Sequence, residues 1–361
     1  MKVFITLKDI TELGGGEKVC VNLANALSQR GFKLVVISLY NSRGAPTYRP
    51  SEALEIIYLK PGAAGRSPIS RLFYKSVYRI YLSLKICKLI AMHKPRVLLA
   101  NDGLFLPLVK SKSTRYLRIW HMSAPKKPRL SLRLFDSLVL LSPKQLDTWR
   151  TYHDSLSVIP NFINEIPKLA PRPRQKRRLL SIGSMGRGDI KGFFRLVQIA
   201  SLLQAGLRDG SNDLLSSWEW VLIGDGPLRG ELENRIRALD LQGFLRIEGF
   251  REDIAAAYES SDIFCLTSHA EGFPMVLLEA MAFGLAAVSF DIASGPSDMI
   301  DDGKSGFLVE DGDIEGFACK LLELMKGPLR IEAMGAFGAS EVRRRFSKEA
   351  ILPLWENLLR G

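Results

Sequence analysis

The sequence predicts an α/β protein made of two doubly wound domains in tandem. Short segments that are apolar throughout alternate with helical patterns, which is typical of parallel sheets covered on both faces. This alternation stops once, in a stretch rich in proline and arginine, and then begins again. The length of 361 residues also suits two domains. We therefore expect an N-terminal domain at residues 1–162, a linker at 163–178 and a C-terminal domain at 179–340.

The first half opens with a β-type segment, a glycine-rich turn and a helical pattern at residues 17–29, which ends at Gly31. Six more apolar segments follow, separated by helical or irregular sequence. The predicted strands of this half are residues 3–7, 34–39, 55–59, 97–100, 116–120, 138–141 and 157–159.

The second half repeats the scheme, with an exposed insertion expected at residues 205–217. Residues 341–361 form an amphipathic helical pattern whose Trp355 needs a surface to pack on. This helix either crosses back to the N-terminal domain or packs on its own domain. The predicted strands are residues 179–182, 220–223, 245–247, 263–266, 286–290 and 307–309, and the predicted helices include 193–203, 228–239 and 275–283.

The composition excludes several classes of protein. Hydrophobic residues make up 47% and charged residues 24% of the chain, as in a globular enzyme and unlike a disordered tail, a collagen or a coiled coil. The cysteines stand far apart without a C-x-x-C pair, which argues against a disulfide scaffold or a zinc motif and suits a reducing compartment. We see neither a signal peptide nor an apolar run long enough for a transmembrane helix, so we expect a cytoplasmic protein.

Positive charge is concentrated in the first half. Residues 1–170 carry 27 Lys and Arg against 10 Asp and Glu, although the whole chain has a net charge of only +12. Residues 60–133 hold 17 basic residues and one acid, Asp102. Such a block indicates an anionic membrane, an anionic substrate or nucleic acid, unless it is a solvated basic face.

Two glycine-rich loops each follow a predicted strand and precede a predicted helix. Gly14–Gly16 is the first, and its backbone and helix start would suit an anion, although a plain tight turn has the same sequence. The second loop, residues 183–192, adds the cations Arg187 and Lys191. Amides and two cations together suit a diphosphate, and the alternative is a basic surface loop.

A pair of carboxylates eight residues apart is the strongest signal. Glu271 follows a buried strand, and Pro274 fits the first turn of the helix that carries Glu279. A carboxylate in this apolar helix is costly unless it is hydrogen-bonded, and sugar or ribose hydroxyls would be suitable partners. The amides of Met275 and Val276 at the helix start could bind phosphate. Taken alone, Glu279 could equally be an exposed helix residue.

This spacing resembles the E-x7-E signature of retaining glycosyltransferases of family-four type. Their GT-B fold consists of two Rossmann-like doubly wound domains facing a central cleft. The resemblance covers nearly the whole chain and is densest from residue 179 to 315. The segments that carry it are residues 14–24, 158–161, 221–227, 246–250, 271–279 and 294–309.

The resemblance implies roles for individual residues. Glu279 would bind the ribose of a nucleotide and Glu271 the donor sugar, while Lys191 and an arginine would hold the diphosphate. His121 resembles the histidine that faces the donor sugar and the acceptor. The family places its arginine directly after the strand glycine, where this chain has Ser184, so Arg187 is assigned in its place. The substrate-binding residues would further include Gly15, Gly16, Gly224, Gly249, Phe250, Gly272, Phe273, Pro274, Met275 and Val276.

The implied reaction is the retaining transfer of a hexose-type sugar from a nucleotide diphosphate sugar, a UDP-sugar, to a glycan or lipid-linked acceptor. The pathway would be cell-surface polysaccharide or lipopolysaccharide synthesis. We see no cluster of candidate metal ligands, so we expect metal independence and no cofactor beyond the donor itself. Paired carboxylates argue against a nucleic-acid partner, because they repel a phosphate backbone.

Residues 71–85 mix aromatic, aliphatic and basic residues, with Arg71, Lys75 and Arg79 four residues apart. This pattern indicates either an interfacial helix on the inner face of the plasma membrane or a core helix with a basic edge. Two other classes of function stay open. One is another GT-B enzyme, such as a nucleotide-sugar epimerase or a phosphorylase, and the other is a basic protein that binds membrane or nucleic acid.

Overall fold

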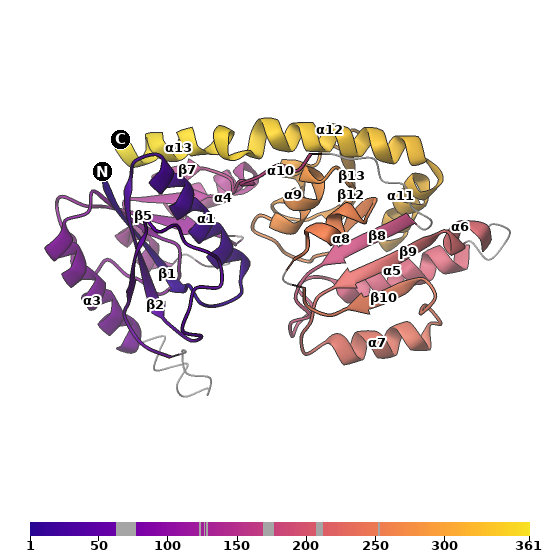
Figure 1. The fold of residues 1–361 in the computed structure, drawn as a ribbon, viewed down its shortest axis with the longest axis horizontal. Coiled ribbons are helices and arrows are strands. Elements are labelled where there is room, and N and C mark those ends of the chain that lie inside the picture. The colour runs from indigo at the N-terminus through magenta and orange to yellow at the C-terminus, as the bar shows by residue number, and fades with distance from the viewer. Residues whose placement is uncertain are drawn as a thin grey trace. The chain divides into compact units, whose positions relative to one another are not determined.

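The computed structural model describes residues 1–62, 77–122, 124–125, 127, 129–168, 177–206, 212–251 and 253–361. The chain forms two compact units: unit 1 comprises Met1–Asn161 with Lys348–Gly361, and unit 2 comprises Phe162–Ser347. Each unit is built on a parallel sheet with helices packed against it (Figure 1). The predicted fold class is therefore confirmed. Within the described ranges, no helix is both long and apolar enough to span a bilayer.

Unit 1 contains a seven-stranded sheet in the order β3-β2-β1-β4-β5-β6-β7, and every neighbouring pair is parallel. The order reverses between β1 and β4, and ligands of doubly wound sheets bind at the carboxyl ends of the strands at such a point. The strands are β1 (Lys2–Asp9), β2 (Lys33–Tyr40), β3 (Glu55–Tyr58), β4 (Val97–Ala100), β5 (Arg115–Trp120), β6 (Ser137–Leu140) and β7 (Leu156–Val158).

The last helix of the chain, α13 (Lys348–Arg360), belongs to unit 1. Trp355 is buried there, and the Arg115 side chain donates from Nη1 to the carbonyl oxygen of Leu358 at 2.9 Å. The other helices of the unit are α1 (Gly15–Gln29), α3 (Val77–His93), α4 (Leu146–Arg150) and the 3-10 turns η1 (Leu130–Leu134) and η2 (Pro143–Gln145).

Unit 2 contains a six-stranded parallel sheet in the order β10-β9-β8-β11-β12-β13, which reverses between β8 and β11. Its strands are β8 (Arg177–Ile182), β9 (Trp218–Ile223), β10 (Leu245–Glu248), β11 (Ile263–Leu266), β12 (Ala286–Asp291) and β13 (Gly306–Glu310). Its helices are α5 (Phe193–Gly206), α6 (Asn212–Ser216), α7 (Arg229–Ala238), α8 (Ala255–Glu259), α9 (Met275–Ala282), α10 (Pro296–Met299), α11 (Ile314–Lys326) and α12 (Pro328–Phe346).

Three expectations about the ends of elements differ from the structure. The expected insertion contains helix α6, and Leu214 and Leu215 pack against the core because they are apolar. The expected terminal helix is interrupted at Ser347, whose backbone is extended, so residues 341–346 end α12 in unit 2. Arg177 and Arg178, expected in the linker, begin β8, where Arg178 pairs with Glu219 at 2.6 Å. Residues 169–176 of that linker lie outside the described residues.

Candidate active site

The loop after β8 is locked to the turn after β9 by close backbone contacts. A Cβ atom on Gly224 would collide with the carbonyl oxygen of Gly183, and one on Gly226 would collide with that of Met185. The Met185 amide also donates to the carbonyl oxygen of Asp225 at 2.9 Å. Glycine is required at both positions, because only hydrogen fits between these backbones. The two loops therefore form one rigid edge at the carboxyl ends of β8 and β9.

Lys191 and Glu271, predicted separately as site residues, form an ion pair in unit 2. Lys191 Nζ lies 2.7 Å from Glu271 Oε1, and the Ser268 hydroxyl donates to the same oxygen at 2.7 Å. The Glu271 side chain is only 10% exposed, whereas that of Lys191 is 28% exposed. Next to Lys191, Gly192 has a φ of +66° and leaves no room for a side chain beside the carbonyl of Thr267. The backbone thus fixes the Lys191 ammonium group close to the loop between β11 and α9 that carries Glu271, here called the carboxylate loop.

The turn after β12 contacts the carboxylate loop and holds it in place. The Ser294 hydroxyl donates to the carbonyl oxygen of Glu271 at 2.7 Å. Gly295, with a φ of +100°, packs so tightly on Pro274 that a Cβ atom would collide with the proline ring. Phe273 is buried and meets Phe346 edge to face, with ring centroids 5.8 Å apart. Phe273 therefore has a packing role, and only the backbone at this position is available to a substrate.

Glu279 lies on α9 and is half-buried. The Tyr258 hydroxyl donates to Glu279 Oε2 at 3.0 Å. Burial raises the pKa of Tyr258 well above its usual value, and the neighbouring Glu279 carboxylate raises it further. The α9 start carries no side-chain cap: Pro274 precedes Met275, and no side chain accepts from the first-turn amides among the described residues. A carboxylate and an uncapped helix start thus occur on one short helix, as ribose and phosphate recognition would require.

The second glycine-rich loop, residues 183–192, meets its expectation only in part. Both carboxylate oxygens of Asp189 accept from the start of α5, from the Phe193 amide at 2.8 Å and the Phe194 amide at 3.0 Å. The expectation that this helix start offers free amides to a diphosphate is therefore wrong. Arg187 is exposed and makes no hydrogen bond or ion pair with another described residue. It lies on the same loop as Lys191, but nothing in the described chain orients it.

The predicted nucleotide-base segment follows β10. Phe250 is 56% exposed, and a Cβ atom on Gly249 would lie 3.3 Å from Arg229 Nη1. The Gly224 amide donates to the carbonyl oxygen of Glu248 at 3.1 Å. The segment therefore adjoins the rigid edge formed by the loops after β8 and β9, and it presents an exposed aromatic ring there.

In unit 1, the glycine loop after β1 has two features that bear on its predicted role. A Cβ atom on Gly15 or Gly16 would meet nothing within 4 Å, so packing does not require glycine at either position. In contrast, the Glu17 carboxylate lies directly over Gly14 at the start of α1. Burial raises the pKa of Glu17. This carboxylate already supplies negative charge to the helix start, which weakens the case for a phosphate there.

His121 follows β5 and is joined to the glycine loop through one residue. Its Nε2 lies 2.7 Å from Asn101 Oδ1, and Asn101 Nδ2 donates to the carbonyl oxygen of Gly16 at 3.3 Å. Burial lowers the pKa of His121 to about 4, and the positive charge of Arg118 contributes. The imidazole is therefore neutral near pH 7 and is held in place by an amide. The carboxyl ends of β4 and β5 thus meet the loop after β1 at one edge of the sheet.

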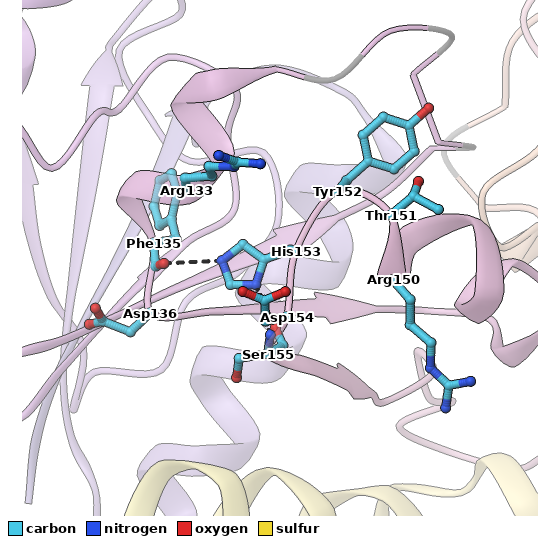
Figure 2. A pocket seen from close by; sticks show the side chains of 9 residues that line it. All are labelled: Arg133, Phe135, Asp136, Arg150, Thr151, Tyr152, His153, Asp154 and Ser155. Carbon is cyan, nitrogen blue, oxygen red and sulfur yellow. Dashed lines mark hydrogen bonds between the residues drawn. The ribbon is translucent and has the colours of Figure 1, made fainter.

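A pocket of about 460 Å³ lies elsewhere in unit 1 (Figure 2). Its lining includes Asp136, Tyr152 and His153, and His153 Nε2 lies 3.1 Å from the carbonyl oxygen of Phe135. These residues precede β6 and β7, so the pocket is at the amino ends of the strands, opposite the edge where His121 lies. Because ligands of such sheets bind at the carboxyl ends, we do not assign this pocket to the active site.

Several residues that support the candidate site were not predicted from the sequence. Tyr258, Ser268 and Asn101 hold Glu279, Glu271 and His121 through single hydrogen bonds. Asn101 could have been found, since it directly follows a predicted strand, and so could Ser268, three residues before Glu271. Tyr258 carries no such signal, because its partner lies 21 residues away on another helix.

Comparison with known proteins gives a family match in the C-terminal part of the chain and relatives along most of its length. Residues 163–351 match the family described as "Glycosyl transferases group 1". The lipopolysaccharide core biosynthesis glycosyltransferase LpsE of Rhizobium meliloti is 26% identical over 367 residues, which cover 96% of each chain. A Campylobacter jejuni α-1,4-N-acetyl-D-galactosaminyltransferase, named for a glycan on PP-undecaprenol, is 26% identical and covers 85% of this chain and 84% of its own.

A crystal structure of S. aureus TarM in complex with Fondaparinux, α-GlcNAc-glycerol and UDP superposes with a TM-score of 0.76. It covers 100% of both chains at 13% sequence identity. At this identity the likeness concerns the fold alone. It confirms two Rossmann-like domains of GT-B type.

Proposed function

The chain belongs to the glycosyl transferases group 1 family, and we propose that it transfers a hexose-type sugar from a UDP-sugar with retention of anomeric configuration. The acceptor would be a glycan or a lipid-linked glycan in lipopolysaccharide or other surface-polysaccharide synthesis. The observation that carries the proposal is the Lys191–Glu271 ion pair, which joins a cation to a buried carboxylate at the carboxyl edge of the unit 2 sheet.

Unit 2 would bind the donor. Glu279 would accept from the ribose hydroxyls, since its carboxylate is half-buried and already oriented by Tyr258. The uncapped start of α9 would donate amides to the diphosphate. Lys191 has three N–H donors, and we assign those not used by Glu271 to the diphosphate. Phe250 would stack on the base because its ring is exposed.

In the proposed reaction, the bond between the anomeric carbon and the diphosphate oxygen breaks, and negative charge grows on the leaving diphosphate. Lys191 and the α9 amides stabilise this charge electrostatically. The acceptor hydroxyl forms its bond to the same face of the anomeric carbon, and its proton passes to the departing phosphate oxygen. Glu271 and neutral His121 bind sugar hydroxyls and orient the donor. The proposed route needs no metal.

The two relatives and the TarM complex support this choice of substrates. LpsE and the Campylobacter enzyme are named for lipopolysaccharide core and for a PP-undecaprenol glycan, and TarM was crystallised with UDP. The names of the two relatives point to lipopolysaccharide and lipid-linked acceptors, and the TarM complex points to a uridine nucleotide; we extend that class of reaction to this chain.

Helix α3 supports an association with the inner face of the plasma membrane. Val77, Ile80, Tyr81 and Leu84 are between 47% and 59% exposed and lie on one helical face together with Lys88. The opposite face is buried in the unit 1 core. An exposed apolar stripe beside lysines fits an anionic lipid surface, which would bring the enzyme to a lipid-linked acceptor. Arg71 and Lys75, which were part of the predicted interfacial helix, lie outside the described residues.

The proposal is tested by a thermal-shift screen of the full chain with UDP, GDP and their common sugars, followed by product analysis. We expect stabilisation by UDP and by at least one UDP-hexose. We also expect that sugar release will depend on an added acceptor. Stabilisation by GDP alone would mean that the donor is a GDP-sugar in place of a UDP-sugar. Acceptor-independent hydrolysis would favour an epimerase. Failure of every nucleotide to bind would overturn the proposal.

A further inference from the structure

Three arginines gather near the carboxyl edge of the unit 1 sheet. Arg118 is on β5, Arg79 is on α3 and Arg129 immediately precedes η1. Arg118 is buried, with 5% of its surface exposed, yet its Nε has no hydrogen-bond partner among the described residues. A buried guanidinium nitrogen without a partner is costly, so it indicates a ligand or a compensating charge.

Aromatic rings and a backbone carbonyl hold these arginines without neutralising them. The Arg118 guanidinium carbon lies 4.9 Å from the Trp120 ring centroid and 5.5 Å from that of Phe135. The Arg129 guanidinium carbon lies 5.6 Å from the same Trp120 ring. Arg79 Nε donates to the carbonyl oxygen of Leu104 at 2.7 Å. All three side chains are therefore oriented, and the cation–π contacts of Arg118 and Arg129 use none of their N–H donors.

The cluster has too little negative charge nearby to balance its three arginines. The nearest carboxylate that acts on it is Asp102, and its oxygens already accept from the Thr6 hydroxyl at 2.6 Å and from two backbone amides. No ion pair joins Asp102 to an arginine among the described residues. The pKa of Arg118 is lowered to about 10, chiefly by burial; Asp102 acts to raise it, and Arg79 and Arg129 act to lower it. The three cations are thus close enough to repel one another.

The cluster borders the candidate catalytic edge. Asp102 follows β4 next to Asn101, which binds His121, and the charge of Arg118 contributes to the low pKa of His121. An anion bound by the cluster would therefore lie beside the residue assigned to the donor sugar and acceptor.

We propose that Arg79, Arg118 and Arg129 form an oxyanion site that binds a diphosphate group carried by the acceptor. The planar guanidinium fork matches phosphate oxygens, and several such groups together suit a multiply charged diphosphate. The acceptor assignment rests on the proposed transferase function, whereas the anion site rests on unit 1 alone. The same phosphate chemistry occurs in bilayer headgroups, which the experiment below distinguishes.

The test is calorimetric titration of inorganic pyrophosphate into the full chain in the presence of saturating UDP. The variant is Arg129→Gln, and the matched control is Arg133→Gln, the same change four residues away in the pocket of Figure 2. We expect the pyrophosphate Kd to rise on the order of tenfold in Arg129→Gln, as for the loss of one charged contact, and to stay unchanged in Arg133→Gln. Arg118→Lys, which keeps the charge but removes the fork, should also weaken binding.

Equal pyrophosphate affinity in the wild type, Arg129→Gln and Arg118→Lys would overturn the anion site. Competition then identifies the source of the phosphate: geranyl diphosphate should displace pyrophosphate, and phosphatidylglycerol vesicles should not. Displacement by the vesicles alone would overturn the acceptor assignment. A separate UDP titration reports on the proposed function, because a chain that fails to bind UDP but shows Arg129-dependent pyrophosphate binding would retain the anion site and lose the transferase assignment.

Discussion

The two units treat positive charge at their candidate sites in opposite ways. In unit 2, Lys191 is paired with Glu271 at 2.7 Å. In unit 1, Arg118 and Arg129 have no ion pair with a described residue and lie against aromatic rings. An anion that reaches Lys191 must share it with a carboxylate, whereas one that reaches Arg118 and Arg129 meets cations that have no ion pair with a described residue. We infer that, in the proposed reaction, unit 2 stabilises negative charge that grows as the donor bond breaks. Unit 1 binds an anion that is already charged in the ground state.

The largest expected effect tests the paired cation of unit 2. Lys191→Ala should lower kcat on the order of 10²–10³-fold with little change in the donor KM, because the charge that Lys191 stabilises grows as the sugar leaves. Arg187→Ala removes a cation from the same loop, but this side chain is exposed and has no ion pair with another described residue. It should cost only about tenfold, since an unoriented donor is not preorganised. Steady-state kinetics of both variants decide the matter.

If Lys191→Ala retains a normal kcat, the proposed mechanism fails. If instead both variants lose activity equally, Arg187 has the full role of the arginine that the family places after the strand glycine.

The second effect concerns nucleotide affinity in unit 2. Glu279→Gln should weaken UDP binding by ~1.5–3 kcal/mol, the range for hydrogen bonds to a charged group. Tyr258→Phe should weaken it by about 1 kcal/mol, because it leaves the carboxylate in place but removes the bond that orients it. Glu315→Gln, an equal charge change on the exposed start of α11, is the control. Calorimetry with UDP measures the three affinities. If all three variants bind UDP like the wild type, Glu279 does not belong to the nucleotide site.

The contrast between the units also explains what the sequence could predict. In unit 2, Glu271, Pro274 and Glu279 lie within nine residues, so a local pattern revealed the motif. The ion pair with Lys191 spans 80 residues, and the sequence did not predict it; the family resemblance only placed both residues in one site. The parallel sheets followed from strand hydrophobicity, and every predicted strand is present within two residues of its expected ends.

In unit 1, the functional groups come from segments that only the fold brings together. Arg79, Arg118 and Arg129 looked like general basic charge in the sequence, because nothing local shows that Arg118 faces Trp120 inside the sheet edge. The capping of α5 by Asp189 was missed for a related reason. Asp189 has a φ of +45°, a conformation that the neighbouring glycines did not predict.

The third effect tests the neutral histidine of unit 1 through the pH dependence of stability. Its folded pKa of about 4 lies below the usual value of 6.5. The unfolded chain therefore binds more protons between these values, and stability is lost as the pH falls. Protonation of His121 should lower the free energy of unfolding by about 2 kcal/mol between pH 7 and pH 5. Urea unfolding of the wild type and His121→Gln at both pH values should show a smaller acid loss in the variant. An identical loss would mean that His121 is not buried as a neutral group.

The smallest effect tests the charge of unit 1 at a membrane rather than at an anionic ligand. Lys88 is exposed on the same face of α3 as Tyr81 and Leu84, and a lysine near an anionic bilayer contributes about 1 kcal/mol. Lys88→Ala should therefore weaken sedimentation with phosphatidylglycerol vesicles about fivefold at low salt, and the difference should shrink as salt screens the charge. Lys33→Ala, an equal loss of exposed charge at the amino end of β2, should bind like the wild type. If both variants lose binding equally, the attraction comes from the overall charge of unit 1, and α3 is no anchor. If neither variant nor salt changes the binding, electrostatics does not bring this protein to the bilayer.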